Sequence, residues 1–301
     1  MASACKHRLM DVHLIDGTYE LFRYYFALPS HVTGDGREVG AIRGVLGSVL
    51  GLIEDGATHV GVATDHVVES FRNELWAGYK DSSGMEAAIL EQFHPLEEAL
   101  RAMGVTVWPM VEFEADDALG AAAAMASADE RVDRVFICTP DKDLGQCVGG
   151  KVVQLDRRKG VVYDAAAVKD KFGVEPASIA DYLALVGDSA DGFPGLMGWG
   201  AKSAATVLAR YGKIEQIPLD SAEWDVNVRG AAKLAATLAQ DFELALLFRR
   251  IATIETDAPV SASVDEMCWR GAGPEFGELA AALDAPGLAE RAQRAASRTK
   301  G

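Results

Sequence analysis

Short apolar runs alternate with amphipathic segments through the first half of the chain. Four of these runs have the length of a strand and are apolar along most of it: "VHLI", "HVGVAT", "VTVWPM" and "RVFICT". The segments between them carry apolar residues at helical spacing, notably Val39–Ile53, Ala87–Met103 and Ala115–Ala126. Strands that are apolar on both faces and separated by helices predict an α/β fold with a mostly parallel sheet flanked by helices.

The second half of the chain has a different pattern. "KVVQLD" and "GVVYD" flank "RRKG" and predict a β-hairpin at the edge of the sheet. From about Pro176 the pattern is helical and is interrupted by one glycine-rich stretch. We therefore expect an α/β core over residues 1–175, a helical region over 176–270 and a helical tail over 271–301. The basic, alanine-rich segment Leu288–Gly301 favours a frayed surface helix.

The composition is that of a globular protein. The 301 residues are 49% hydrophobic and 25% charged, which allows a substantial core. No apolar run reaches the length of a membrane span, and no long apolar segment follows the basic residues of "MASACKHRLMDVH". The cysteines (Cys5, Cys138, Cys147 and Cys268) lack metal-ligand spacing and are interpreted as reduced thiols of a cytoplasmic protein.

The acidic residues gather behind the predicted strands. In an open parallel sheet the carboxyl ends of the strands meet at one edge, so acids at these ends should lie close together. Two further acids follow the next predicted helix at a spacing of three residues, which lets both face the same way. The whole set is Asp16, Asp65, Glu114, Asp116, Asp117, Asp141, Asp143, Asp188 and Asp191.

Each acid taken singly has an alternative explanation as a helix N-cap or as a first-turn residue that suits the helix dipole. That explanation fails for the set, because so many carboxylates repel each other unless cations neutralise them. Oxygen ligands without a His or Cys contribution favour Mg²⁺ or Mn²⁺, and a pair of such ions suits phosphodiester hydrolysis. None of the six histidines has ligand spacing, and His66 is interpreted as a surface neighbour of Asp65.

The net charge of −16 argues against a nucleic-acid binder, whose surface is usually basic. A set of nine carboxylates reserved for metal would account for more than half of that charge, so the objection weakens without vanishing.

Asp16 also opens "DGT", a sequence found in phosphatases of the haloacid-dehalogenase type. Those enzymes need an aspartate nucleophile two residues earlier, where this chain has Leu14. A leucine cannot form an aspartyl phosphate, so we interpret the Gly-Thr as incidental and Asp16 as a metal ligand.

The glycine-rich stretch "GFPGLMGWGAKSAATVLARYG" contains Gly195, Gly198, Gly200 and then Lys202. Glycines at this spacing let backbone amides approach a phosphate, and Lys202 falls in the first turn of the next helix. A helix-turn-helix packed with small residues is the alternative. Beside the carboxylate set, we favour a second contact with the backbone of DNA.

Five motifs in order resemble the bacterial 5′–3′ exonuclease and flap-endonuclease family, as in the 5′-nuclease domain that precedes bacterial DNA polymerase I. The motifs span roughly Val12–Asp257: "LIDGTYELFRYYFALP", "SFRNELWAGYK", "EFEADDALGAAA", "TPDKDLGQCV" and "ALVGDSADGFPGLMGWGAKSAATVLARYG". The resemblance implies a PIN-like sheet, a helical arch over about residues 71–93 and a helix-three-turn-helix region. Because the chain ends at Gly301, we expect a stand-alone member.

The resemblance also implies roles for individual residues. One metal group would be Asp16, Asp65, Glu114 and Asp116 with Asp117 adjacent; the other would be Asp141, Asp143 and Asp191 with Asp188 in support. Within the arch, Arg72 and Lys80 would supply catalytic charge to the scissile phosphate and Tyr79 would stack on a base, while Arg23 would contact phosphate. A K⁺ ion at the glycine-rich loop is a further expectation from the family.

The chain departs from the family at several positions. Asp81-Ser82-Ser83-Gly84 replaces a run with another cation, which should weaken the grip of the arch on phosphate. Thr64 stands where a phenylalanine is common, Gly145 where a bulky residue is common, and Trp199 where an aliphatic residue is common.

The sequence therefore predicts a monomeric, nucleoid-associated enzyme of the cytoplasm that cleaves DNA at 5′ flaps or free 5′ ends, and possible substrates include RNA. Two-metal hydrolysis would leave 5′-phosphate and 3′-hydroxyl ends in replication and repair. The alternatives are a non-catalytic binder of structured DNA, a ribonuclease on the same acidic sheet and a Mg²⁺-dependent phosphatase.

Overall fold

The computed structural model describes residues 9–299, and its contacts divide the chain into two compact units. The first unit comprises residues 1–68, 82–139 and 255–301, and the second comprises residues 69–81 and 140–254. Each unit is described by itself. The expected boundaries at residues 175 and 270 divide the chain into consecutive segments, whereas these units are discontinuous in sequence. The expected boundaries stay predictions.

The first unit contains a parallel sheet. Its strands β1 (Met10–Asp16), β2 (His59–Asp65), β3 (Thr106–Met110) and β4 (Val132–Cys138) lie in the order β3-β2-β1-β4. Val12, Leu14 and Ile15 of β1 are fully buried, as are Val60 and Val62 of β2. The runs of β1 and β2 therefore mark central strands, whereas β3 lies at the edge of the sheet and is only partly buried. The predicted parallel sheet is confirmed.

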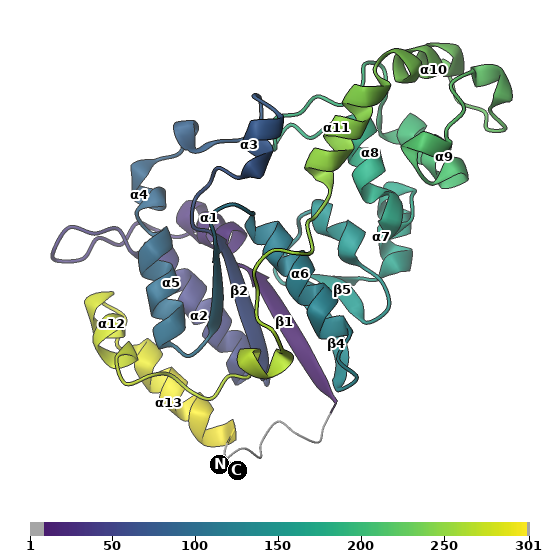
Figure 1. Ribbon diagram of the computed structural model, residues 1–301. Helices are drawn as coiled ribbons and strands as arrows, with labels where there is room; N and C mark the ends of the chain where they lie inside the picture. The colour runs from purple at the N-terminus through teal and green to yellow at the C-terminus, as the bar shows by residue number, and fades with distance from the viewer. Residues whose placement is uncertain (1–8, 300–301) are drawn as a thin grey trace. The chain divides into compact units, whose positions relative to one another are not determined.

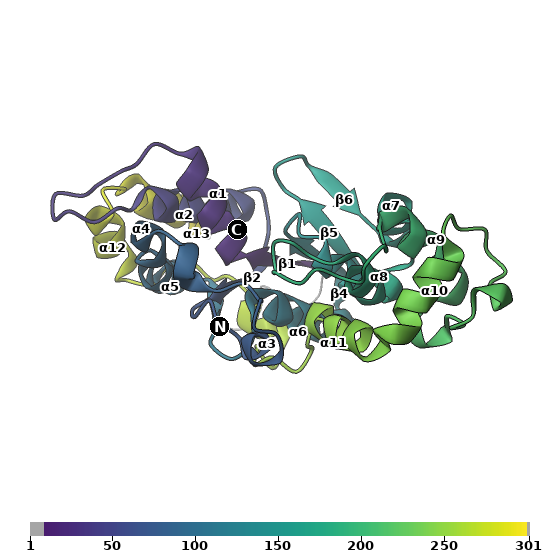
Figure 2. The same cartoon turned by 90° about the horizontal axis from the view of Figure 1, so that it is seen from above.

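Helices cover both faces of this sheet. Seen from above, α1 (Gly17–Ala27) and α2 (Gly40–Glu54) lie on one side of β1 and β2, and α6 (Ala115–Ser127) lies on the other (Figure 1, Figure 2). The strand order explains this arrangement. The chain moves outward from β1 to β3 and then returns past β1 to β4, so a right-handed return places α6 on the opposite face.

The helix expected over Ala87–Met103 is broken into α4 (Ala87–Leu90) and α5 (Phe93–Ala102). Pro95 has no backbone N–H to donate to the carbonyl of Glu91, so the helical ladder is interrupted there. The buried Gln92 amide then bonds across the break: its Nε2 donates to the Ala88 carbonyl and its Oε1 accepts from the Ile42 backbone N–H.

The C-terminal segment packs more firmly than a frayed surface helix. Helix α13 (Gly287–Thr299) buries Leu288, Ala292 and Ala295, and Arg291 makes a 2.6 Å ion pair with Glu54 of α2. It is preceded by α12 (Phe276–Ala282). Arg294 and Arg298 remain exposed, and Lys300 lies outside the described residues.

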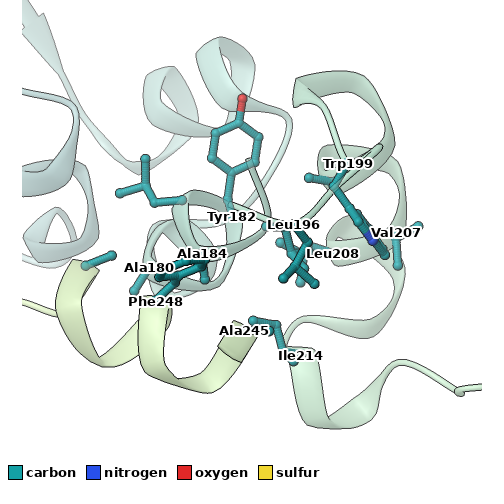
Figure 3. Packing of buried hydrophobic residues seen from close by; sticks show 14 of the residues in the cluster. Ala180, Tyr182, Ala184, Leu196, Trp199, Val207, Leu208, Ile214, Ala245 and Phe248 are labelled. Carbon is teal, nitrogen blue, oxygen red and sulfur yellow. The ribbon is translucent and has the colours of Figure 1, made fainter. Parts of the chain in front are cut away.

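The second unit is mainly helical, with one hairpin. The predicted hairpin is confirmed as β5 (Val152–Asp156) antiparallel to β6 (Val161–Tyr163). The helices are α3 (Phe71–Leu75), α7 (Ala165–Phe172), α8 (Ile179–Val186), α9 (Ala201–Tyr211), α10 (Ala231–Gln240) and α11 (Phe242–Ala252). Their core joins Leu196 and Leu208 to Ala184 and Phe248, and Trp199 lies beside Val207 (Figure 3).

The segment expected to form an arch contains α3, a 3-10 turn at Ser82–Gly84 and α4. The arch itself stays a prediction.

Two further expectations can be compared with the structure. Cys138 and Cys147 are reduced thiols, but Cys268 is disulfide-bonded, so the prediction of a reduced thiol is wrong for this residue. Cys5 lies outside the described residues. Among the described residues, no helix is both long and apolar enough to cross a bilayer.

Phe248 offers a test of the second core. It is fully buried, so Phe248→Ala should lower the free energy of unfolding by about 3–5 kcal/mol, measured by urea denaturation. Phe26→Ala is the matched control, because the Phe26 side chain is 71% exposed and its loss should cost about 0.5 kcal/mol or less. Equal effects of the two variants would contradict the assigned core.

Candidate metal centre

Asp16 lies where β1 passes into α1. One carboxylate oxygen, Oδ1, accepts a 2.8 Å hydrogen bond from the Tyr19 backbone N–H and caps the helix. The other, Oδ2, accepts a 3.0 Å bond from the Thr139 hydroxyl, which follows β4. The capping explanation considered for a single acid is therefore observed here, and these bonds also hold a buried carboxylate in a fixed orientation at the end of the sheet.

Gly17 and Thr18 position the next acid, so the interpretation of this Gly-Thr pair as incidental is wrong. A Cβ on Gly17 would lie 2.8 Å from the Ala63 carbonyl, which shows how closely the start of α1 approaches β2. The Thr18 hydroxyl accepts a 2.8 Å bond from the backbone N–H of Asp65. Asp16 and Asp65 thus lie at the ends of neighbouring strands that are tied together by the residues between them.

Asp65 is also tied to the third acidic motif. Its Oδ1 accepts a 2.7 Å hydrogen bond from the backbone N–H of Ala115, at the start of α6. Glu114 and Asp116 flank that residue, and Glu114 is buried. We call Asp16, Asp65, Glu114 and Asp116 the first carboxylate group. Strand order and helix start bring this group to one edge of the sheet.

Asp117 differs from its neighbours. It is fully buried, and each of its oxygens accepts a backbone bond: Oδ2 from Glu114 at 3.0 Å and Oδ1 from Glu255 at 2.8 Å. These contacts favour a bracing role at the start of α6. Direct contact of Asp117 with metal stays a prediction.

The second carboxylate group consists of Asp141, Asp143, Asp188 and Asp191. Oxygens of Asp143, Asp188 and Asp191 lie within 4.8 Å of one another. Asp188 and Asp191 face the same way as expected, but through a turn rather than a helix, because Asp188 and Phe193 exchange backbone hydrogen bonds of 2.8 and 3.0 Å. Asp141 is exposed, and its Oδ1 accepts a 2.9 Å bond from the Asp143 backbone N–H.

The charge of Asp143 is poorly compensated. Burial raises the pKa of its carboxyl well above the usual value, the charges of Asp141, Asp191 and Asp188 raise it further, and Lys142 lowers it. Its Oδ1 is buried and accepts no hydrogen bond within residues 9–299, with the Lys142 ammonium 3.5 Å away. Lys142 forms an ion pair with Asp188 as well.

This donor set fits divalent metal ions. Carboxylate oxygens are the ligands that Mg²⁺ and Mn²⁺ prefer, and an unsatisfied buried carboxylate oxygen needs a cation. The residues that would hold such ions are Asp16, Asp65, Glu114 and Asp116 in the first unit and Asp141, Asp143, Asp188 and Asp191 in the second.

Lys80 lies beside the second carboxylate group. Its ammonium is 3.0 Å from Asp191 Oδ1, and its backbone N–H donates to the Asp191 carbonyl. The Trp76 indole N–H donates to the Gly192 carbonyl at 3.0 Å and fixes the segment further. A cation is therefore held at the edge of this group, and its contact with the scissile phosphate stays a prediction.

Unlike Lys80, Arg72 and Tyr79 are buried in the second unit. Arg72 is buried; its Nε donates to the Ile251 carbonyl at 2.8 Å and its Nη2 to the Thr253 carbonyl at 2.9 Å. Tyr79 is buried in the core of the second unit, which is the alternative considered for it. Contact of Arg72 with phosphate and contact of Tyr79 with a base stay predictions. The observed burial of both side chains favours neither prediction.

Arg23 lies on α1 in the first unit. It pairs with the buried Glu20 at 2.5 Å, and its guanidinium lies 4.1 Å from the centre of the Tyr24 ring. Its side chain is 23% exposed, and its contact with a phosphate stays a prediction.

The glycine-rich loop joins α8 to α9. A Cβ on Gly195 would lie 2.3 Å from the Gly187 backbone nitrogen, and Gly195 has a φ of +69°, so a larger residue would force the two backbone segments apart. Gly198 is exposed with a φ of +85°, and Gly200 caps α9. Lys202 is exposed in the first turn of α9. The loop therefore presents backbone and one cation to solvent.

Sequence reasoning missed Thr18, Thr139 and Lys142. The Thr18 hydroxyl bonds to the backbone of Asp65, and the Thr139 hydroxyl bonds to the carboxylate of Asp16. A threonine beside a strand end is common, so the sequence does not indicate that it orients an acid. Lys142 lies between two predicted ligands in "DKD", and that position could have identified it as their counter-charge.

Models of two known domains match nearly the whole chain. The 5′–3′ exonuclease N-terminal resolvase-like domain matches residues 11–173, and the 5′–3′ exonuclease C-terminal SAM fold matches residues 174–275. All the predicted metal ligands fall within these matches.

Relatives agree with this assignment. DNA polymerase I of Pseudomonas aeruginosa is 36% identical over 264 residues, covering 84% of this chain and 28% of that protein. The 5′–3′ exonuclease of Aquifex aeolicus is 34% identical over 211 residues, covering 69% of this chain and 72% of that protein. The chain thus spans less than a third of the length of the polymerase relative.

Solved structures share the fold at lower identity. The T5 D15 protein, co-crystallised with metal ions, has a TM-score of 0.64 at 17% identity and covers 97% of this chain and 100% of its own. The catalytic core of Rad2 in complex with DNA substrate has a TM-score of 0.61 at 18% identity, with coverages of 97% and 93%. The resemblance inferred from the five motifs is confirmed.

Asp143→Asn tests the electrostatics of the second group. The folded-state pKa is raised from 3.8, so the folded, metal-free protein loses stability as the pH rises above that value. In EDTA at neutral pH the variant should melt above the wild type by roughly 3 °C or more, equivalent to about 1 kcal/mol. Differential scanning calorimetry measures both proteins.

The gap should narrow as the pH falls toward the ordinary aspartate pKa. Saturating Mn²⁺ should raise the melting temperature of the wild type more than that of the variant. A variant that melts below the wild type in EDTA at neutral pH would contradict the assigned charge crowding.

Proposed function

Because this chain belongs to the 5′–3′ exonuclease family, we propose that it is a structure-specific 5′ nuclease that hydrolyses DNA with the help of divalent metal ions. The observation that carries the proposal is the buried Asp143 oxygen without a hydrogen-bond partner in the described chain, within a group that includes Asp188 and Asp191. The proposed substrates are branched or nicked duplexes with 5′ flaps or free 5′ ends. A monomer in the cytoplasm, active in replication and repair, belongs to the same proposal.

The proposed cofactor is Mg²⁺ or Mn²⁺. When bound, such ions polarise the phosphate, promote deprotonation of the attacking water and stabilise the charge on the leaving oxygen. Products would carry 5′-phosphate and 3′-hydroxyl ends. A K⁺ ion at the carbonyls of the glycine-rich loop is part of the proposal as well.

The residues of the chain would orient the acids and hold the substrate. Thr18 and Thr139 fix the first carboxylate group through hydrogen bonds, and Lys142 offsets the charge of the second. Lys80, which pairs with Asp191, would exchange that partner for a phosphate oxygen as charge develops. The glycine-rich loop and Lys202 would hold the duplex backbone without reading bases.

A non-catalytic binder of structured DNA is the second candidate. Two observations favour it. Asp81 directly follows Lys80, and the whole chain has a net charge of −16, so both features should weaken binding of a phosphate in the transition state. Salt-sensitive binding without cleavage in either Mg²⁺ or Mn²⁺ would select this candidate.

Removing one carboxylate from each group tests the nuclease proposal. Asp65→Asn and Asp143→Asn should each lower kcat/KM for a labelled 5′-flap oligonucleotide in Mg²⁺ by on the order of 10³-fold, because an ion loses a ligand. Asp133→Asn and Asp170→Asn are exposed controls in the first and second units and should cleave normally. Wild-type rates for Asp143→Asn and Asp141→Asn combined would refute the metal assignment.

Lys80 and Arg72 should separate into two phenotypes. Lys80→Met should lower the cleavage rate by about 10²–10³-fold while the protein stays folded in Mg²⁺, because a charge-stabilising donor is lost. Arg72→Met should destabilise the fold by about 1.5–3 kcal/mol, because two backbone carbonyls lose a charged donor. Thermal melts beside single-turnover kinetics check both, and a stable but inactive Arg72→Met would restore the direct phosphate contact.

Lys202 should contribute to binding alone. Lys202→Ala should weaken binding to duplex-containing flaps and reduce the slope of log K against log salt by about 1, while leaving kcat unchanged. Fluorescence anisotropy at several salt concentrations measures this. Lys233→Ala, exposed on α10 of the same unit, is the control. Equal slopes for wild type and Lys202→Ala would show that Lys202 does not contact the DNA backbone.

A further inference from the structure

His66, His94 and Glu97 form a cluster in the first unit, called the histidine cluster. One ligand atom from each lies within 4.8 Å of the other two. His94 and Glu97 are three residues apart on α5 and share a face of that helix, while His66 directly follows the last residue of β2. The separation of residues 66 and 94 along the chain explains why spacing alone gave no signal for this site.

Glu97 is the anchor of the cluster. Its side chain is only 2% exposed, which is unusual for a carboxylate unless a cation compensates it. Its Oε1 accepts a 2.7 Å hydrogen bond from the buried Thr64 hydroxyl, and its Oε2 lies 2.8 Å from His66 Nδ1. The Thr64 hydroxyl is neutral, and the two imidazoles lie on the side of Oε2.

The two imidazoles meet edge to face beside this oxygen. Their ring centres are 4.0 Å apart with an angle of 70° between the planes. His94 is exposed and His66 is half-buried, so the cluster opens to solvent on the histidine side and is closed on the glutamate side. Two imidazole nitrogens and one carboxylate oxygen therefore lie within 4.8 Å of one another, with one of the imidazoles exposed to solvent.

We propose that the histidine cluster binds a transition-metal ion of the zinc class, separately from the oxygen-only carboxylate groups. Imidazole with carboxylate suits Zn²⁺, whereas oxygen ligands alone suit Mg²⁺ and Mn²⁺. Three protein ligands and one open position form a common tetrahedral zinc arrangement. The inference goes beyond the proposed nuclease and does not depend on it.

The geometry needs only a small adjustment. Bonds of about 2.0–2.2 Å in a tetrahedron place two ligands roughly 3.4 Å apart. The His66–Glu97 pair at 2.8 Å would open slightly, and the exposed His94 would turn inward on the surface of α5. The Thr64 hydroxyl already fixes the orientation of Glu97, which is the support that metal-binding carboxylates receive from an outer hydrogen bond.

Isothermal titration of the full-length protein with Zn²⁺ tests the proposal by comparing the wild type with variants in the same buffer, because Zn²⁺ would also enter the carboxylate groups ahead of Mg²⁺. The wild type should bind one equivalent that His94→Gln loses or binds at least about tenfold more weakly, a cost typical of disturbing a metal site. His94 is exposed, so this substitution should not unfold the protein, and a thermal melt checks that.

Controls identify the ligands. His31→Gln removes a half-exposed histidine that pairs with Asp284 elsewhere in the first unit, and it should leave the zinc isotherm unchanged. Thr64→Val should weaken zinc binding by about 10–100-fold through the loss of its hydrogen bond to Glu97. Unchanged isotherms for both His94→Gln and His66→Gln, or loss of zinc binding in Cys147→Ser instead, would overturn the proposal.

Discussion

Mutual repulsion among carboxylates held close together is the constraint on which the structure depends. Asp143 is buried with like charges around it, and the Lys142 ammonium supplies part of the counter-charge in the metal-free protein. Water would disperse that repulsion if the acids were exposed. A buried, charged Asp143 among such neighbours destabilises the fold as long as no further cation compensates it. The protein therefore accepts instability at this position, which is typical of a site that has a function.

Backbone contacts hold the acids in position. Gly17 lets α1 approach β2 closely, and Thr18 then accepts the Asp65 backbone N–H. In the second unit, the contact of Gly195 with Gly187 closes the loop that follows the Asp188–Phe193 turn. In both units a small residue without a Cβ brings segments close enough to position an acid. The proposed metal ligands are thus positioned by residues outside the proposed ligand set.

Much of the fold was predictable, because fully apolar strands and strand-end acids are strong local signals. The parallel sheet and the acids at its strand ends followed from them, whereas the order β3-β2-β1-β4 came from the structure and the division into two carboxylate groups from the family resemblance. The roles of Arg72 and Tyr79 were less accessible, because burial depends on neighbours far along the chain, such as the carbonyls of Ile251 and Thr253. Spacing within a motif cannot reveal whether a cation faces solvent or caps a distant helix. The break in the helix before α5 was visible in principle from Pro95.

Thr64, a departure from the family pattern, contacts a residue of the proposed zinc site. Its hydroxyl donates a hydrogen bond to Glu97 and thereby orients a carboxylate of the histidine cluster. His66 of that cluster directly follows Asp65. The central claim concerns the carboxylate groups, and anomalous diffraction from crystals soaked in Mn²⁺ tests it most directly. The account predicts Mn²⁺ peaks at bonding distance from Asp143 Oδ1 and from Asp65 or Glu114. Saturating Mn²⁺ with no peak at either group would contradict it.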